Sequence, residues 1–238
     1  ANRERTVAAH RDRDAFVSVH QGVRYTYGEF DAAVDDLAIG LMRLGLARGD
    51  RVGIWGPNHV EWALVQYATA KIGVVLVNVN PAYRTHELTY ALRQSGCRVL
   101  IAAPAFRTSD YVDMVASVRA DLPALERAVF FWSDEWDALR AGGTAAERDA
   151  LRARAATLQF DDPINIQYTS GTTGFPKGAT LSHHNILNNG YFVAEGLRYT
   201  ELDRVCVPVP LYHCFGMVMG NLGATTHGAC VVYPEAAF

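Results

Sequence analysis

The residues best suited to chemistry form one polar run near the middle of the sequence, YTSGTTGFPKG, over residues 168–178. From Thr169 to Gly178 this run contains three glycines, four hydroxyl side chains and Lys177. Such a loop can direct backbone N–H groups and hydroxyls at a polyphosphate, because glycine permits close approach and positive φ angles. The composition therefore predicts a phosphate-binding loop. The alternative is a solvated turn that carries a lysine by accident.

The spacing of this loop differs from that of the P-loop in the GTPase and kinase class, G-x-x-x-x-G-K-[ST]. Lys177 is preceded by Pro176 and followed by Gly178, so the hydroxyl that would bind Mg²⁺ directly after the lysine is absent. Lys71 and Lys177 are the only lysines among the 22 basic residues. The presence of one of them in the loop favours a role in phosphate binding over accident.

A second candidate for chemistry is His213, in the run VPVPLYHCFGMVMG. Here a strand-like segment ends in an aromatic pair and a glycine. A histidine in apolar surroundings often serves as a hydrogen-bonded core residue, and this alternative stays open. Phe215, Met217 and Met219 could line an apolar channel, and core packing explains the same pattern equally well.

The four cysteines, at positions 97, 206, 214 and 230, form no C-x-x-C pair. Cys206, His213, Cys214 and Cys230 lack the spacing of zinc ligands, so we predict no metal site there. We expect the cysteines to pack as small apolar residues. Because no disulfide framework is visible, a reduced, cytoplasmic compartment fits best.

The segments around these candidates alternate between short apolar runs and helical stretches. A T-x-x-E pattern at Thr26 and Glu29 predicts a capped helix that ends at Gly45. Farther along, we expect strands at 52–55, 74–79, 99–102 and 128–132, and helices at 58–72, 86–94, 111–119 and 144–156. This alternation predicts an α/β fold with a mainly parallel sheet covered by helices on both faces.

The composition changes at Asp161-Asp162-Pro163, after a stretch rich in arginine and alanine. We place a boundary there. Residues 1–162 would form a first α/β subdomain, and residues 163–238 would form the phosphate-loop segment and the start of a second, incomplete one. Asp161 and Asp162 show no paired-carboxylate spacing that suggests acid–base chemistry, and we expect both on the surface.

Charge and hydropathy argue against several functional classes. With 22 basic and 25 acidic residues the net charge is −3, so the basic patch that nucleic acid requires is not expected. The apolar runs are far shorter than the roughly 20 residues of a membrane-spanning helix, and the charged N-terminus does not resemble a signal peptide. We expect a soluble protein without a nucleic-acid partner. The oligomeric state stays open, a homo-oligomer included.

The run YTSGTTGFPKG resembles the signature loop of the AMP-forming adenylate ligases, the superfamily of acyl-CoA synthetases, firefly-type luciferases and nonribosomal adenylation domains. Four more segments resemble this family and occur in its order: YTYGEF, GLARGDRVGIWGPN, NVNPAYRTHEL and PLYHCFG. Within the superfamily, the chain is most similar to acyl-CoA synthetases that act on medium-chain fatty acids. The fold implied is part of the N-terminal domain of such a ligase.

The resemblance implies a two-step reaction on a medium- or long-chain fatty acid. The carboxylate attacks the α-phosphorus of ATP, with Mg²⁺, to give acyl-AMP and pyrophosphate, and coenzyme A then displaces AMP. The residues that match the loop holding the β and γ phosphates are Thr169, Ser170, Gly171, Thr172, Thr173, Gly174 and Lys177. By the same resemblance His213 lies beside the adenylate and the mouth of the acyl tunnel, and Phe215 and Met217 are then the candidate contacts of the acyl chain. Lys177 and His213 are thus the candidate catalytic residues.

Several parts of the family have no counterpart in this sequence. The Y-G-x-T-E segment with its Mg²⁺-associated glutamate, the ribose-binding aspartate, the hinge and the mobile C-terminal domain are absent. We therefore expect residues 1–238 alone to be inactive. Two alternatives remain: an adenylating enzyme that loads a carrier protein or oxidises its acyl group, and a non-catalytic nucleotide-binding module.

Overall fold

The computed structural model describes residues 2–169 and 176–237. Its main sheet has six strands, in the spatial order β10 (Lys177–Ser182), β9 (Pro163–Thr169), β4 (Val75–Val79), β3 (Arg51–Trp55), β5 (Val99–Ala102) and β8 (Arg127–Phe130). The pair β9–β10 is antiparallel, and the other four pairs are parallel. The predicted strands at 52–55, 74–79 and 99–102 are confirmed to within one residue.

A second sheet joins the two ends of the described chain. Its strands are ordered β11 (Arg204–Cys206), β12 (Cys230–Tyr233), β1 (Asp14–Ser18) and β2 (Val23–Thr26). The parallel pair β1–β12 links strands from opposite ends of the sequence. Each sheet thus contains strands from before and after residue 162. The division into subdomains at this residue stays a prediction.

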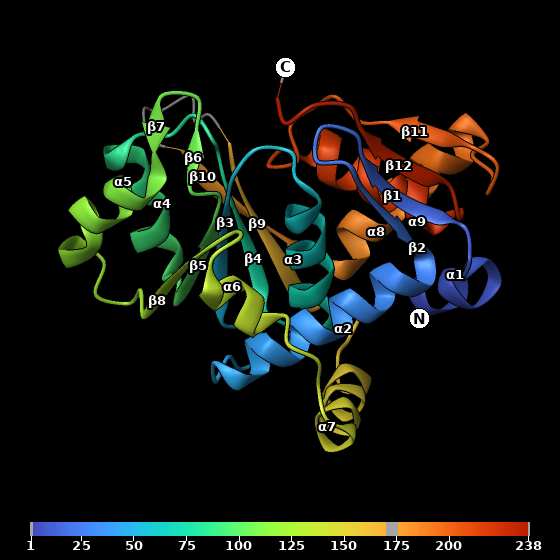
Figure 1. Cartoon of the computed structure of the whole chain (residues 1–238), viewed down its shortest axis with the longest axis horizontal. Helices are drawn as coiled ribbons and strands as arrows, with labels where there is room; N and C mark the ends of the chain where they lie inside the picture. Colours follow the sequence, from blue (N-terminus) through green and yellow to red (C-terminus); the bar gives the residue numbers. More distant parts are fainter. Residues whose placement is uncertain (1, 170–175, 238) are drawn as a thin grey trace.

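Helices cover both faces of the main sheet, as predicted (Figure 1). On one face lie α4 (Thr85–Ser95) and α5 (Tyr111–Val118). On the other face, α3 (Val60–Lys71) and α8 (His183–Leu197) lie between the two sheets, and α2 (Tyr27–Arg43) packs against α3. The fold is therefore a layered α/β structure with mainly parallel sheets.

The remaining elements are short. They are α1 (Asn2–His10), β6 (Ala105–Phe106), β7 (Ser109–Asp110), the 3₁₀-helix η1 (Arg119–Asp121), α6 (Asp134–Leu139), α7 (Ala145–Ala156), the π-helix η2 (Phe215–Leu222) and α9 (Gly223–Thr226). Among the described residues, no helix is both long and apolar enough to cross a membrane.

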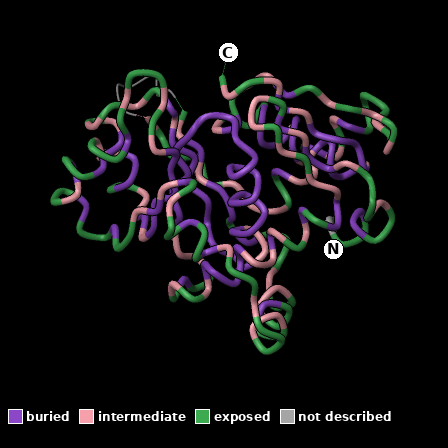
Figure 2. The backbone as a smooth tube through the Cα atoms, viewed as in Figure 1, coloured by how far each residue is buried: buried purple, intermediate pink, exposed green. Residues whose placement is uncertain are grey.

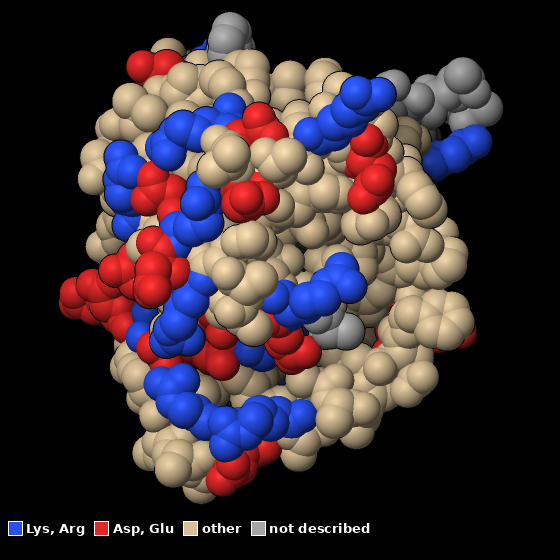
Figure 3. Space-filling model, turned by 90° about the vertical axis from the view of Figure 1, so that its right-hand side faces the viewer, with Lys and Arg blue, Asp and Glu red and all other residues tan. Residues whose placement is uncertain are grey.

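Basic and acidic side chains are interspersed on the face of the molecule shown in Figure 3.

The start of α2 shows why the sequence pattern predicted this helix correctly. The Thr26 hydroxyl accepts a hydrogen bond from the Glu29 backbone N–H at 3.2 Å, and the Glu29 carboxylate accepts one from the Thr26 N–H at 2.8 Å. Each bond satisfies a backbone donor that the first turn leaves without an intrahelical partner. The Thr26 N–H and the Thr26 hydroxyl, which both donate to the Glu29 carboxylate, hold the pKa of Glu29 below its ordinary value.

The core is concentrated around α3 and the central strands, which are coloured as buried in Figure 2. All residues of α3 from 60 to 69 are buried, because the helix lies between two sheets and has no solvent face. At the end of β3, Trp55 stacks on Tyr111 with a centroid separation of 3.5 Å, and its indole N–H donates to the Asn80 carbonyl. The main sheet is thereby fixed to the helices that cover it.

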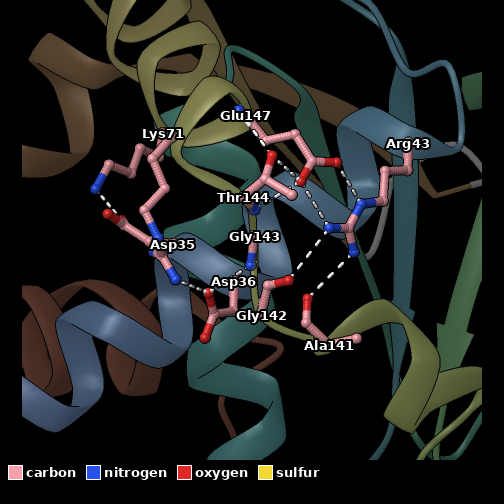
Figure 4. A network of polar contacts seen from close by, with 10 residues as sticks. Asp35, Asp36, Arg43, Lys71, Ala141, Gly142, Gly143, Thr144 and Glu147 are labelled. Atoms are coloured by element: carbon pink, nitrogen blue, oxygen red, sulfur yellow. Dashed lines mark hydrogen bonds and ion pairs between the residues drawn. The ribbon is translucent and has the colours of Figure 1, made fainter.

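A polar network attaches α7 to α2 (Figure 4). The Arg43 guanidinium contacts both carboxylate oxygens of Glu147, at 2.7 and 2.9 Å, and also donates to the carbonyls of Ala141 and Gly142. Glu147 in turn accepts from the backbone N–H of Thr144, the N-cap of α7. Bonds from Arg43 and Thr144 lower the pKa of Glu147 to about 2.

Some expectations about single residues are wrong. Asp162 is buried, because its carboxylate accepts a hydrogen bond from the Gln159 backbone N–H at 2.9 Å and pairs with Arg48. Cys206 and Cys214 are exposed, whereas the other two cysteines are buried. Cys206 lies on an edge strand of the second sheet, and Cys214 directly precedes η2.

A buried histidine, His59, is expected to make the stability of the fold depend on pH. His59, at the start of α3, is 9% exposed, and its Nδ1 has no hydrogen-bond partner among the described residues. The centroid of its ring lies 5.4 Å from that of the His20 ring and 5.0 Å from that of the Trp132 ring, which it meets edge to face. Burial lowers the pKa of His59 to about 4, with the Glu61 carboxylate opposing this shift and His20 adding to it. The imidazole is therefore neutral in the folded protein near neutral pH.

We expect His59 to destabilise the fold as the pH falls from about 6.5 to about 4, because only the unfolded chain then protonates this group. At about 1.4 kcal/mol per pKa unit, the full loss is at most about 3.5 kcal/mol. Denaturant unfolding across this pH range should give a shallower pH dependence for His59→Gln than for the wild type. Equal slopes would show that His59 does not carry the effect.

Candidate functional site

Two of the predicted phosphate-binding residues face each other across a hairpin. Thr169 ends β9 and Lys177 begins β10, and they are directly opposed in the antiparallel register. The Thr169 hydroxyl lies 3.4 Å from the Lys177 carbonyl oxygen, to which it donates, and Lys177 is exposed. The other predicted loop residues, Ser170, Gly171, Thr172, Thr173 and Gly174, lie outside the described residues.

This hairpin is placed at the carboxyl ends of parallel strands. Since β9 is parallel to β4, and β4 to β3, the chain leaves β9 at the same edge where those two strands end. In open α/β sheets this is the edge where ligands bind. The sheet therefore presents Thr169 and Lys177 where a nucleotide site is expected.

Helix α4 holds the base of the hairpin through two tyrosines. The Tyr90 hydroxyl donates to the Pro176 carbonyl at 3.1 Å, and the Tyr168 hydroxyl donates to the Ala91 carbonyl at 2.9 Å. The two rings pack edge to face, with centroids 6.3 Å apart. Burial raises the pKa of Tyr168 to about 12, so its hydroxyl stays a donor at neutral pH. Both arms of the hairpin are thus tied to one helix.

His213 lies in a tight turn that leads into η2. Its carbonyl accepts from the N–H groups of Gly216 and Met217, both at 3.1 Å, and its Nδ1 accepts from the Phe215 N–H at 3.1 Å. The imidazole is exposed, and Nε2 is the ring nitrogen left to meet a ligand. A side chain at position 216 would bring its Cβ to 2.5 Å from the Pro210 carbonyl oxygen, so the turn requires glycine.

Phe215 and Met217 point to different surroundings. Phe215 is 51% exposed, whereas Met217 is 1% exposed. The Met217 sulfur lies 3.2 Å from Asn78 Nδ2 and 3.5 Å from Gln167 Nε2. Met217 is therefore a core residue packed against β9, the strand that leads to the predicted phosphate loop, whereas Phe215 is largely exposed.

The register of the hairpin places Thr169, Lys177 and Met217 on one side of the main sheet. Residues two apart in a strand share a face, so Thr169 is on the face where Gln167 contacts Met217. Directly opposed residues in antiparallel strands also share a face, which adds Lys177. The structure therefore brings the end of the phosphate loop and η2 to the same side of the sheet, although they are far apart in sequence.

A cavity of about 370 Å³ is lined in part by Met217, one of the three residues that could line an apolar channel, whereas Phe215 and Met219 do not line it. Its apolar lining includes Ala70, Leu76, Ile164, Ile186, Met217 and Leu222. Leu76 and Ile164 lie near the starts of β4 and β9, so the cavity extends from η2 toward the amino ends of these strands. An apolar chain whose head group lay at the carboxyl edge could place its tail there.

The walls of this cavity come from segments that are far apart in the sequence, so no local sequence pattern predicts them.

Two segments that resemble the family, GPN at 56–58 and NVN at 78–80, had no role assigned from the sequence, but each contains an asparagine that the structure buries. Asn58 and Asn78 are buried, at 3% and 2% exposure, although asparagine is mostly a surface residue. Both contact the segment that carries His213.

Comparison with known proteins identifies the family of this chain. The family model described as "AMP-binding enzyme" matches residues 3–238. The chain is 42% identical over 253 residues to the "Medium-chain acyl-CoA ligase ACSF2, mitochondrial" of Danio rerio, and 40% identical over 253 residues to the protein of that name from Mus musculus. These alignments cover 98% and 95% of this chain. They cover 42% and 41% of the relatives, so the chain spans less than half their length.

A solved structure supports the same assignment. The N-terminal domain of FACL13 from Mycobacterium tuberculosis superposes with a TM-score of 0.81 and 25% identity. The superposition covers 98% of this chain and 56% of that chain. The predicted partial N-terminal domain of an adenylate-forming ligase is thereby confirmed. The chain belongs to the AMP-binding enzyme family.

Proposed function

We propose that the full-length protein is an AMP-forming fatty acid–CoA ligase. It would join ATP and a fatty acid into acyl-AMP with release of pyrophosphate, and then form a thioester with coenzyme A. The observation that carries this proposal is the pairing of Thr169 and Lys177 on the same side of the sheet as Met217 and the cavity behind it. A phosphate-binding loop and an apolar cavity on one side of a sheet suit a substrate with one charged end and one apolar end.

The proposed role of the loop is to hold the ATP phosphates and neutralise their charge. Phosphoryl chemistry depends chiefly on positioning and on groups that offset developing negative charge. Lys177 supplies a cation at the start of β10, and Thr169 supplies a hydroxyl opposite it. We propose that Ser170, Gly171, Thr172, Thr173 and Gly174 complete this loop, on the strength of the family resemblance. Mg²⁺ would accompany the phosphates, and among residues 2–169 and 176–237 no cluster of acidic, histidine or cysteine side chains could hold it.

His213 and its neighbours would contact the acyl group. The exposed imidazole, with Nδ1 held by the Phe215 N–H, would present Nε2 to the carboxylate or adenylate. Met217 would form the wall between this point and the apolar cavity. The cavity volume of about 370 Å³ falls in the usual range for small-molecule sites, and its lining supports a medium-chain acid. The names of the two ACSF2 relatives support the same substrate class.

We propose the cytoplasm as the compartment. The four cysteines are free thiols, which supports a reducing environment. The two relatives compared above carry mitochondrial names, and their full chains are longer than this one. Fractionation of cells that express the tagged full-length protein tests this assignment.

The proposed activity is tested by ATP–pyrophosphate exchange with the full-length protein. A series of straight-chain acids from acetate to palmitate should give exchange, with a maximum at medium chain length. Adding coenzyme A should then yield acyl-CoA, detected by mass spectrometry. Exchange without an acyl-CoA product would instead favour an enzyme that loads a carrier protein, and the absence of exchange with every acid would contradict the proposal. Light scattering on the same sample distinguishes a monomer from a homo-oligomer.

A further inference from the structure

Two buried asparagines hold the chain segment that carries His213. Asn58 follows β3, and its side chain binds the backbone on both sides of Pro210. Asn58 Nδ2 donates to the Val209 carbonyl at 2.9 Å, and Asn58 Oδ1 accepts from the Leu211 N–H at 2.9 Å. This pair of bonds reproduces what a neighbouring strand would supply.

Asn78, in β4, binds the next part of the same segment. Its Nδ2 donates to the Tyr212 carbonyl at 2.9 Å and contacts the Met217 sulfur at 3.2 Å. Its Oδ1 accepts from Asn165 Nδ2 at 2.9 Å, which fixes the orientation of the amide. Asn78 therefore binds both the peptide immediately before His213 and the side chain of Met217.

The segment needs these contacts because, among the described residues, no strand pairs with it after Val207. The Val207 N–H donates to the Val232 carbonyl, and after this bond the backbone leaves the second sheet. The Val209 carbonyl and the Leu211 N–H bond to Asn58, and the Tyr212 carbonyl bonds to Asn78. A peptide group removed from water without a hydrogen-bond partner destabilises the fold, so these bonds from the two amides fix the path of the segment.

We infer that Asn58 and Asn78 are positioning residues, which place His213 and Met217 relative to the strand that leads to the phosphate loop. This inference rests on the proposed function and adds to it two residues that act through others. Both amides lie near the carboxyl ends of adjacent strands, β3 and β4, and thus beside the edge at which β9 ends. Displacement of a reacting group by about 1 Å can cost on the order of 100-fold in rate.

The test uses Asn58→Ala and Asn78→Ala in the full-length protein, with pyrophosphate exchange measured against acid and ATP separately. Each variant should lose roughly 10- to 100-fold in kcat/KM for the acid, with the KM for ATP changed less than about 2-fold. Asn58→Asp and Asn78→Asp keep the shape and the acceptor but lose the amide donor, and should show the same split. Asn58→Ser and Asn78→Ser, which place no charge in the buried site, serve if the other variants do not fold.

The matched control is Tyr27→Phe, which removes another buried hydrogen bond from a side chain to the backbone, from the Tyr27 hydroxyl to the Ala229 carbonyl at 2.7 Å. It should lower the melting temperature and leave both kinetic constants unchanged. Combining Asn58→Ala with His213→Ala should give less than the product of the two single effects, because both act on one group. Asparagine variants that behave like Tyr27→Phe, or effects that multiply fully, would overturn the inference. A wild type that activates no acid would contradict the proposed function instead.

Discussion

Replacing Lys177 with alanine in the full-length protein is expected to slow adenylation on the order of 10- to 1000-fold. Lys177 is the residue that begins β10 directly opposite Thr169, and its side chain is exposed at the edge where the phosphate loop leaves the sheet. Removing a charge-assisted contact to a transition state that gains charge raises the barrier, whereas contacts equal in both states change only KM. The loss should therefore persist at saturating ATP and acid.

The control for this experiment separates charge from position. Lys177→Arg keeps the cation but alters its reach and hydrogen-bond geometry, and should lie between wild type and Lys177→Ala. Arg152→Ala removes one cation from the exposed surface of α7, where Arg152 pairs with Asp149, and should leave the rate unchanged. Single-turnover formation of acyl-AMP is the direct measurement. A Lys177→Ala enzyme with the wild-type rate would mean that the loop does not act on the phosphates.

The fold could be predicted wherever the signal is local. The capping pattern at Thr26 predicts the start of α2. Short apolar runs between helical stretches predict β3, β4 and β5. The pairing of β1 with β12 could not be predicted, because it joins residues 14–18 to residues 230–233 and depends on the packing of everything between. The π-helix η2 was not predicted from the sequence, and its packing against α8 forms only in the folded chain.

The candidate site divides in the same way. The predicted phosphate loop is a continuous run of glycines, hydroxyls and one lysine, so its binding role could be predicted from the sequence, and it stays a prediction. The cavity is different, because its lining belongs to several elements that meet only in the folded chain. Asn58 and Asn78 are an intermediate case. Their segments resemble the family, but the proposed role depends on hydrogen bonds to residues 151 and 134 positions away in sequence.

Filling the part of the cavity near Ala70 is expected to have the second large effect, on the chain length of the acids that the enzyme accepts. Ala70 lines the cavity near the end of α3, next to Leu76 at the start of β4, and thus far from the edge that carries Lys177. If an acyl chain enters past Met217, its last methylenes lie near Ala70. Ala70→Trp should therefore shorten the acids that the enzyme accepts, because the indole would occupy space that the tail needs. Ala70→Ser, which barely changes volume, is the matched control.

The size of this effect follows from the burial of methylene groups. Each buried CH₂ contributes about 0.8 kcal/mol, so displacing about four of them costs roughly 3 kcal/mol, or on the order of 100-fold in affinity. For Ala70→Trp, kcat/KM in pyrophosphate exchange should fall by about this factor with dodecanoate and stay near the wild-type value with butanoate. Melting temperatures of both variants monitor the cost of overpacking, which is typically 1–3 kcal/mol. An equal loss with both acids at unchanged stability, or full activity with dodecanoate, would show that the acyl chain does not extend into this cavity.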